Sequence, residues 1–157
     1  HNTQPCPGFG TINDGQRQVR LFGEWRLNAP PFKSEITSMT TLIKFADQSP
    51  EATSQDTSGA TISGTPEHTV WVHFKGADDS FRAGVWESTA GVFHGPQNDQ
   101  IEYCYILEGE ASIRTNDGKD IIVKAGDGFV MDNGLQPVWT VKEHVKKQWV
   151  IVSVPKA

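Results

Sequence analysis

From residue 65 onward, short runs of alternating apolar and polar residues recur along the chain, and they predict an all-β structure. The runs are rich in Val, Ile, Thr and aromatic residues, which favour strands. None of them keeps a 3.6-residue period over the length of a helix. The predicted strands cover residues 69–74, 81–89, 101–114, 120–125, 128–132, 137–141 and 147–154.

Turn signals separate these runs. Asn-Asp-Gly at 116–118 and Asp-Asn-Gly at 132–134 favour the positive φ angles of tight hairpins. Short strands joined by such turns predict a sandwich or a barrel, and jelly-roll and cupin barrels are the compact options at this length. We therefore expect an antiparallel barrel of about seven to ten strands.

Residues 1–64 have a different texture and predict an irregular N-terminal extension. Two apolar pieces, at 19–27 and 41–46, each predict an edge strand or a strand exchanged with a partner subunit. The stretch 49–63 is rich in Ser and Thr, and we expect residues 47–61 to form a mobile linker. The predicted barrel domain then spans residues 65–157.

The charge of the chain argues against nucleic acid as a partner. The formal net charge is -5, whereas a phosphate-binding protein needs a concentrated basic face. The basic cluster of Lys142, Lys146 and Lys147 is diluted by Glu143, and we interpret it as a solvated strand end, with Lys146 on a predicted turn.

Membrane and disulfide signals are also missing from the sequence. No apolar run reaches the roughly 18 residues that a membrane helix needs. Cys6 and Cys104 lie far apart, which does not suggest a disulfide framework and favours a reducing compartment. The default prediction is a cytoplasmic protein that does not bind membranes.

Five blocks in order give the chain a family resemblance: Gly-Val-Trp-Glu at 84–87, the strand 102–109 that ends in Leu-Glu-Gly, Ala-Gly-Asp at 125–127, Trp-Thr-Val at 139–141 and Lys-Lys at 146–147. They resemble the two-motif core of the cupin superfamily. More narrowly, they are similar to the small single-domain cupins grouped with (S)-ureidoglycine aminohydrolase, many of which have no assigned activity. The resemblance implies a cupin jelly-roll barrel and a homodimer, which would cover exposed strand edges.

The same resemblance implies that the usual cupin metal site is degraded here. Metal-binding cupins hold Mn, Fe, Zn or Ni with three inward His and one Glu. The family spacing places the Glu at Glu102. The positions of the three His hold residues without an imidazole: Pro96, Asn98 and Pro137, with Gly95 and Gln97 in place of the first two if the loop has one more residue. We therefore expect no cofactor.

A degenerate metal site stays open as an alternative. His94 lies two residues before the expected ligand position, and a bulge would turn it inward beside Glu102. His68 or His73 would then add a ligand from a neighbouring strand. In this alternative His94 and Glu102 bind Mn, Zn, Fe or Ni.

Glu102 is the main candidate for a catalytic residue. Strand alternation places Glu102, Cys104 and Ile106 on one face and Tyr103 and Tyr105 on the other, and the cupin resemblance implies that the face of Glu102 points inward. Desolvation inside an aromatic barrel disfavours an ionised carboxylate unless a cation pairs with it, and general acids and bases arise in this way. The alternative is a structural Glu that is satisfied by Arg82 or by an indole N–H.

The other candidate pocket residues are Arg82, Trp86, Cys104, Trp139 and Asp132. Arg82 shares a strand face with Trp86, and an inward Arg would bind a carboxylate through two hydrogen bonds. Trp86 and Trp139 would form pocket walls or fill the core. Cys104 is a candidate nucleophile or a small buried residue. Asp132 would bind a polar group at the barrel mouth or simply form the turn.

Three functions follow from these observations. The first is a barrel that binds a small polar or nitrogen-containing metabolite without a tightly held metal, with Glu102 as acid/base or anchor. The second is a metal-dependent enzyme of the aminohydrolase type. The third is a non-enzymatic ligand sensor or structural module. If the chain is an enzyme, hydrolase or isomerase chemistry is expected, although fold alone does not fix activity.

Overall fold

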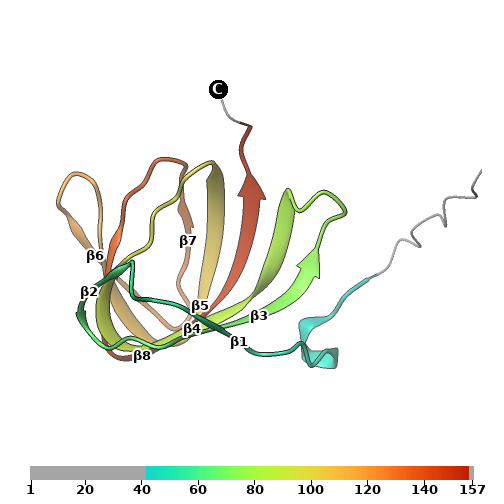
Figure 1. The fold of residues 1–157 in the computed structure, drawn as a ribbon, viewed down its shortest axis with the longest axis horizontal. Coiled ribbons are helices and arrows are strands. Elements are labelled where there is room, and N and C mark those ends of the chain that lie inside the picture. The colour runs from blue at the N-terminus through green and yellow to red at the C-terminus, as the bar shows by residue number, and fades with distance from the viewer. Residues whose placement is uncertain (1–41, 156–157) are drawn as a thin grey trace, which may run out of the picture. The chain divides into compact units, whose positions relative to one another are not determined.

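Three long antiparallel strands, β4 (Phe81–His94), β5 (Gln100–Arg114) and β8 (Val138–Ser153), form the centre of the fold (Figure 1). The computed structural model describes residues 42–155, which all belong to one compact unit of the chain. The shorter elements are the 3-10 helix η1 (Phe45–Asp47) and the strands β1 (Thr53–Gln55), β2 (Thr61–Gly64), β3 (His68–Lys75), β6 (Asp120–Lys124) and β7 (Gly128–Met131). No helix in this part of the chain is long and apolar enough to span a membrane.

All strand pairs are antiparallel. The strand order is β1-β3-β4-β8-β5-β6, and β2 also pairs with β4 while β7 pairs with β5. Figure 1 shows the long strands curving around a common interior. The predicted all-β, jelly-roll class of fold is confirmed, with eight strands.

Strand β5 shows how alternation builds the interior. Glu102, Cys104 and Ile106 are buried, whereas Tyr103 and Tyr105 are 45% and 38% exposed. Because successive side chains of a strand point to opposite faces, one face of β5 forms the barrel wall and the other its outside. The predicted inward and outward assignments are therefore confirmed.

The strand β8 corrects a prediction of two separate strands. Residues 137–141 and 147–154 are predicted as two strands, with His144 and Lys146 on a turn, but one strand runs from Val138 to Ser153. Its backbone pairs with β4 on one edge and β5 on the other, and a fully buried Val145 anchors the middle. Hydrogen bonding on both edges outweighs the polar character of this stretch.

The stretch predicted as a mobile linker also contains regular structure. β1 and the first residues of β2 lie between residues 49 and 63 and pair with β3 and β4. Backbone pairing needs no apolar side chain, so Ser and Thr residues add strands at the edge of an existing sheet. Residues 42–46 form a coil and the start of η1 rather than a strand, and the predicted strand at 19–27 lies outside the described residues.

Two glycines allow the chain to turn and to pack closely. Gly118, with a φ of 81°, lies in the turn between β5 and β6, where the amide of Thr115 donates to the carbonyl of Lys119. Gly109, with a φ of 77°, lies where a Cβ would come within 2.0 Å of the carbonyl oxygen of His144. Only glycine fits such a position, so Gly109 lets β5 and β8 stay paired through their irregular region.

Candidate functional site

A cavity of about 590 Å³ lies inside the barrel. Its walls come from β3, β4, β5 and β8, with contributions from the segments that follow β1 and β4. Four of the candidate residues from the sequence line it together: Arg82, Trp86, Glu102 and Trp139. The volume lies within the range of small-molecule sites.

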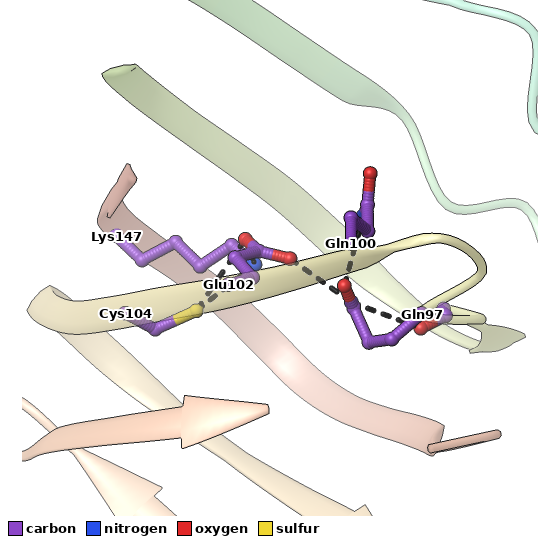
Figure 2. Close-up of polar contacts among 6 residues, drawn as sticks. Gln97, Gln100, Glu102, Cys104 and Lys147 are labelled. Atoms are coloured by element: carbon purple, nitrogen blue, oxygen red, sulfur yellow. Dashed lines mark hydrogen bonds and ion pairs between the residues drawn. The ribbon is translucent and has the colours of Figure 1, made fainter. Parts of the chain in front are cut away.

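The most buried charged groups of this cavity form an ion pair. Lys147 Nζ lies 2.8 Å from Glu102 Oε1, and both residues are only 6% exposed (Figure 2). Burial alone would lower the pKa of Lys147, but the neighbouring Cys104 and Glu102 outweigh burial and raise it. Lys147 is therefore an ammonium at neutral pH. Breaking such a buried pair on one side typically costs about 3–5 kcal/mol.

This pair corrects two sequence-based interpretations. Lys147 was assigned to a solvated cluster, yet its ammonium is the cationic partner of Glu102. The structural alternative for Glu102 invoked Arg82 or an indole N–H, and neither donates to it. Lys147 lies two residues from both Val145 and Trp149 on β8, so the three side chains share one face of the strand. That face points to the interior, because Val145 and Trp149 are also buried.

Two glutamines extend the hydrogen-bond network toward the loop between β4 and β5. Gln97 Nε2 donates to Glu102 Oε2 at 3.0 Å and to the carbonyl of Gly95 at 3.3 Å. Gln97 Oε1 accepts a hydrogen bond of 2.8 Å from Gln100 Nε2 (Figure 2). The amide of Gln97 is thus held in one orientation and fixes the second carboxylate oxygen of Glu102.

Cys104 completes the polar cluster as a neutral thiol. Its Sγ donates to Glu102 Oε1 at 3.4 Å and accepts from Lys147 Nζ at 3.5 Å. Burial raises the pKa of the Cys104 thiol to about 12, so almost no thiolate forms at neutral pH. Cys104 is fully buried and does not line the cavity. These features correct its assignment as a pocket residue and candidate nucleophile, because the thiolate is the nucleophilic form. Cys6 lies outside the described residues.

Aromatic rings surround the ammonium. Lys147 Nζ lies 4.9 Å from the ring centroid of Trp86 and 4.8 Å from that of Trp139. Both indoles are buried and also pack on Phe93, so they act as core residues and as cavity walls. The faces of the rings favour a cation, which adds to the attraction from Glu102.

His68 is a further cavity residue. It is 9% exposed and packs edge-on against the rings of Trp86 and Phe93. Burial and the charge of Lys147 lower the pKa of His68, so its imidazole is neutral at neutral pH. Its Nε2 is buried and has no hydrogen-bond partner within residues 42–155.

Two sequence candidates play other roles. Asp132 is exposed and does not line the cavity, since its carboxylate accepts the backbone N–H of Asn133 at 2.8 Å and forms the turn. His94 lines the cavity but is exposed, and Gln97 rather than His94 lies beside Glu102. Of the two alignments of the cupin ligand positions, the one with an extra loop residue places Gln97 at a ligand position. Gln97 is the residue that points inward beside Glu102.

The residues around Glu102 do not fit the divalent metal that cupin barrels usually hold. An ammonium, a neutral thiol and an amide N–H donate to its carboxylate oxygens, and none of these groups is a metal ligand in that state. Pro137, at the position of the third His, is fully buried and has no ligating atom. Within residues 42–155 no group of three or more His, Cys, Asp or Glu side chains could hold a metal.

The comparison with known families finds a match in the barrel. Residues 75–149, just under half of the chain, match the model of the EutQ-like cupin domain. This stretch is therefore similar to a EutQ-like cupin domain. It contains Glu102, Lys147 and the two tryptophans beside the ammonium. No curated protein matches the chain.

Solved structures share the cupin fold at low sequence identity. A Pseudomonas syringae pv. tomato protein of unknown function matches with a TM-score of 0.58 and 23% identity, over 65% of this chain and 44% of that one. The Clostridium difficile EutQ protein matches with a TM-score of 0.54 and 14% identity, over 74% of this chain and 83% of that one. A Thermotoga maritima protein described as a predicted oxalate decarboxylase matches with a TM-score of 0.52 and 21% identity, over 73% and 100%.

These likenesses establish the fold and carry no activity. The chain spans less than half of the Pseudomonas syringae protein. The chemistry of this cupin domain must therefore be argued from its own cavity.

Proposed function

We propose that the cupin barrel binds a small polar organic molecule without a metal ion, with the Glu102–Lys147 pair as its charged anchor. The observation that carries this proposal is the Lys147 ammonium, which lies 2.8 Å from the carboxylate oxygen that metal-binding cupins use as a ligand. A fixed protein cation thus stands where those proteins hold a metal cation.

The anchor keeps hydrogen-bonding capacity for a ligand. An ionised carboxylate offers about four acceptor positions. Lys147, Cys104 and Gln97 occupy three of those on Glu102 among the described residues. The ammonium has three N–H groups, and two of them donate to Glu102 and Cys104. One acceptor position on Glu102 Oε2 and one N–H of Lys147 remain, which suits a hydroxyl, amide or amine group of a ligand.

The same pair is suited to proton transfer. Glu102 can accept a proton from a bound molecule while the Lys147 ammonium stabilises the negative charge that develops on it. Hydrolase or isomerase chemistry is compatible with this arrangement. The resemblance to the (S)-ureidoglycine aminohydrolase-like group supports a nitrogen-containing ligand, whereas its metal-dependent chemistry has no support from the residues around Glu102.

A panel of small polar metabolites tests the proposal by thermal shift and by tryptophan fluorescence, because Trp86, Trp139 and Trp149 line the cavity. We expect at least one molecule to stabilise the wild type and to lose binding in Glu102→Gln. Glu87→Gln is the matched control, since Glu87 pairs with Lys146 outside the cavity, with an N–O distance of 3.8 Å. Binding that is equal in wild type and Glu102→Gln, or no binding from the whole panel, would overturn the proposal.

Turnover of a bound molecule would assign the domain as an enzyme, and stabilisation without turnover would assign it as a sensor or binding module. The homodimer stays a prediction. The outer face carries exposed apolar side chains that a second copy would cover, including Phe81, Ile101, Tyr103, Val130 and Val152. Light scattering of the full chain checks it.

A further inference from the structure

Two buried polar atoms have no hydrogen-bond partner among the described residues, and both belong to the wall of the same cavity. They are Nε of Arg82 and Nε2 of His68. A buried donor or acceptor without a partner loses its hydrogen bonds to water and gains none in return, so such atoms are rare in native proteins. The coincidence of the two residues in one cavity points to a ligand that contacts both side chains.

Arg82 differs from the other cations that line the cavity. Lys75 pairs with Asp79 at 3.1 Å, and Lys147 pairs with Glu102. Within residues 42–155, Arg82 has neither an ion pair nor a hydrogen bond from its buried Nε. A guanidinium cannot lose its proton in a protein, so this group stays a cation and can only donate.

The sheet register places Arg82 on the same level as Glu102. Arg82 on β4 pairs with Ile151 on β8, and Ile151 pairs with Glu102 on β5. All three residues line the cavity. Because neighbouring strands lie about 4.8 Å apart, the backbones of Arg82 and Glu102 are separated by roughly 10 Å across the cavity wall. One small molecule can therefore contact both side chains.

Arg82 is the cation of the cavity wall that is left for an anionic ligand. Within residues 42–155, three cationic side chains line the cavity, Lys75, Arg82 and Lys147, and two anionic ones, Asp56 and Glu102. Lys75 pairs with Asp79 and Lys147 with Glu102, so Arg82 is the one of these three cations without an ion pair. A dianion such as phosphate would bring a second negative charge close to Glu102, and no further unpaired cation lines the described part of the cavity to stabilise it. The planar fork of a guanidinium matches a carboxylate through two parallel hydrogen bonds.

We propose that the ligand is a small organic acid whose single carboxylate binds Arg82 and whose second polar group reaches the Glu102–Lys147 pair. This inference rests on the proposed function and narrows it to one class of molecule. Ile151 lies between Arg82 and Glu102 in the register, and Trp149 is the next cavity-lining residue of β8, beside Gly84, which provides space for its ring. The neutral imidazole of His68 offers one more polar contact deeper along β3.

Matched pairs of acid and amide test the inference by calorimetric titration of the full chain. The probes are lactate with lactamide, mandelate with mandelamide and N-acetylglycine with its amide, with inorganic phosphate as a separate arm. We expect at least one acid to bind roughly tenfold or more tightly than its amide. The preference should vanish in Arg82→Gln, weaken in Arg82→Lys and persist in Arg114→Gln, an exposed arginine paired with Asp120 at 2.9 Å.

The outcomes separate this inference from the proposed function. Amides that bind as well as acids, an acid preference that survives in Arg82→Gln, or phosphate that binds more tightly than every acid would overturn the organic-acid class. If the amides that bind the wild type lose binding in Glu102→Gln, the proposed function stands although the organic-acid class does not. Absence of binding by all three acids overturns the organic-acid class as well. Circular dichroism checks folding, and Arg82→Lys carries the test if Arg82→Gln does not fold.

Discussion

Two halves of strand β5 face the same interior with opposite chemistry. Glu102 and Cys104, near its start, belong to the polar cluster around Lys147, whereas Ile106, Ala111 and Ile113 belong to the apolar core. Both halves are buried and share the same pairing partner, β8. The difference separates the part of the barrel that stabilises the fold from the part that we propose binds a ligand.

The apolar half needs no explanation beyond burial, since each buried aliphatic side chain contributes about 1.5–3 kcal/mol. The polar half is different. Replacing a buried ion pair by apolar residues of similar volume is often neutral or stabilising, so the Glu102–Lys147 pair is weak evidence for stability. The pair lines a cavity, which is consistent with the binding role that we propose for it.

Breaking the ion pair should give the largest effect. Lys147→Met leaves the Glu102 carboxylate buried without its cation, and we expect a loss of about 3–5 kcal/mol in the free energy of unfolding. In the double variant with Glu102→Gln, most of this loss should be regained. Urea unfolding measures both. Additive losses in the double variant would contradict the pairing.

Truncating the apolar half should cost nearly as much stability but spare binding. Ile106→Ala removes a fully buried side chain, and we expect a loss of about 2–5 kcal/mol. Because Ile106 does not line the cavity, ligands found for the wild type should bind the folded variant with unchanged affinity. A specific loss of binding would mean that the two halves are coupled.

The neutral state of His68 should appear as a pH dependence. The pKa of His68 is lowered in the folded protein, so between that pKa and the ordinary value of 6.5 the unfolded chain binds more protons. Stability should fall as the pH drops below 6.5 through this window, and His68→Phe should remove that part of the fall. Unfolding of both proteins from about pH 8 to about pH 5 measures the difference. Parallel curves would contradict a lowered pKa.

The smallest effects should come from the residues that the structure moves out of the site. In a Cys6→Ser background, Cys104 should resist alkylation in the native state and react only after unfolding, because its thiol pKa is about 12. Asp132→Asn should change stability by no more than about 0.5 kcal/mol and leave ligand binding intact. Rapid alkylation of Cys104 in the native state would show that its thiol is reactive and accessible. Loss of ligand binding in Asp132→Asn would show that Asp132 belongs to the site.

Alternation and turn chemistry were enough to predict an all-β sandwich or barrel, because both depend on local periodicity. The jelly-roll class and the inward position of Glu102 also needed the cupin resemblance of the five ordered blocks. The buried position of Lys147 is not predicted from the sequence, because a run of charged residues resembles a solvated turn. The two-residue spacing that puts Lys147 on the same face as Val145 and Trp149 is nevertheless visible in the sequence. The side chain of Gln97 is placed by a loop, whose length the family spacing left open by one residue. The unpaired state of Arg82 depends on tertiary packing, which no sequence pattern encodes.

Metal analysis of the full chain tests whether the Lys147 ammonium takes the place of a metal at Glu102. Untagged wild type and Glu102→Gln would be incubated with Mn, Zn, Fe or Ni, dialysed and measured by mass spectrometry of the elements. The account predicts no metal whose binding depends on Glu102. Near-stoichiometric metal in the wild type that disappears in Glu102→Gln would contradict it.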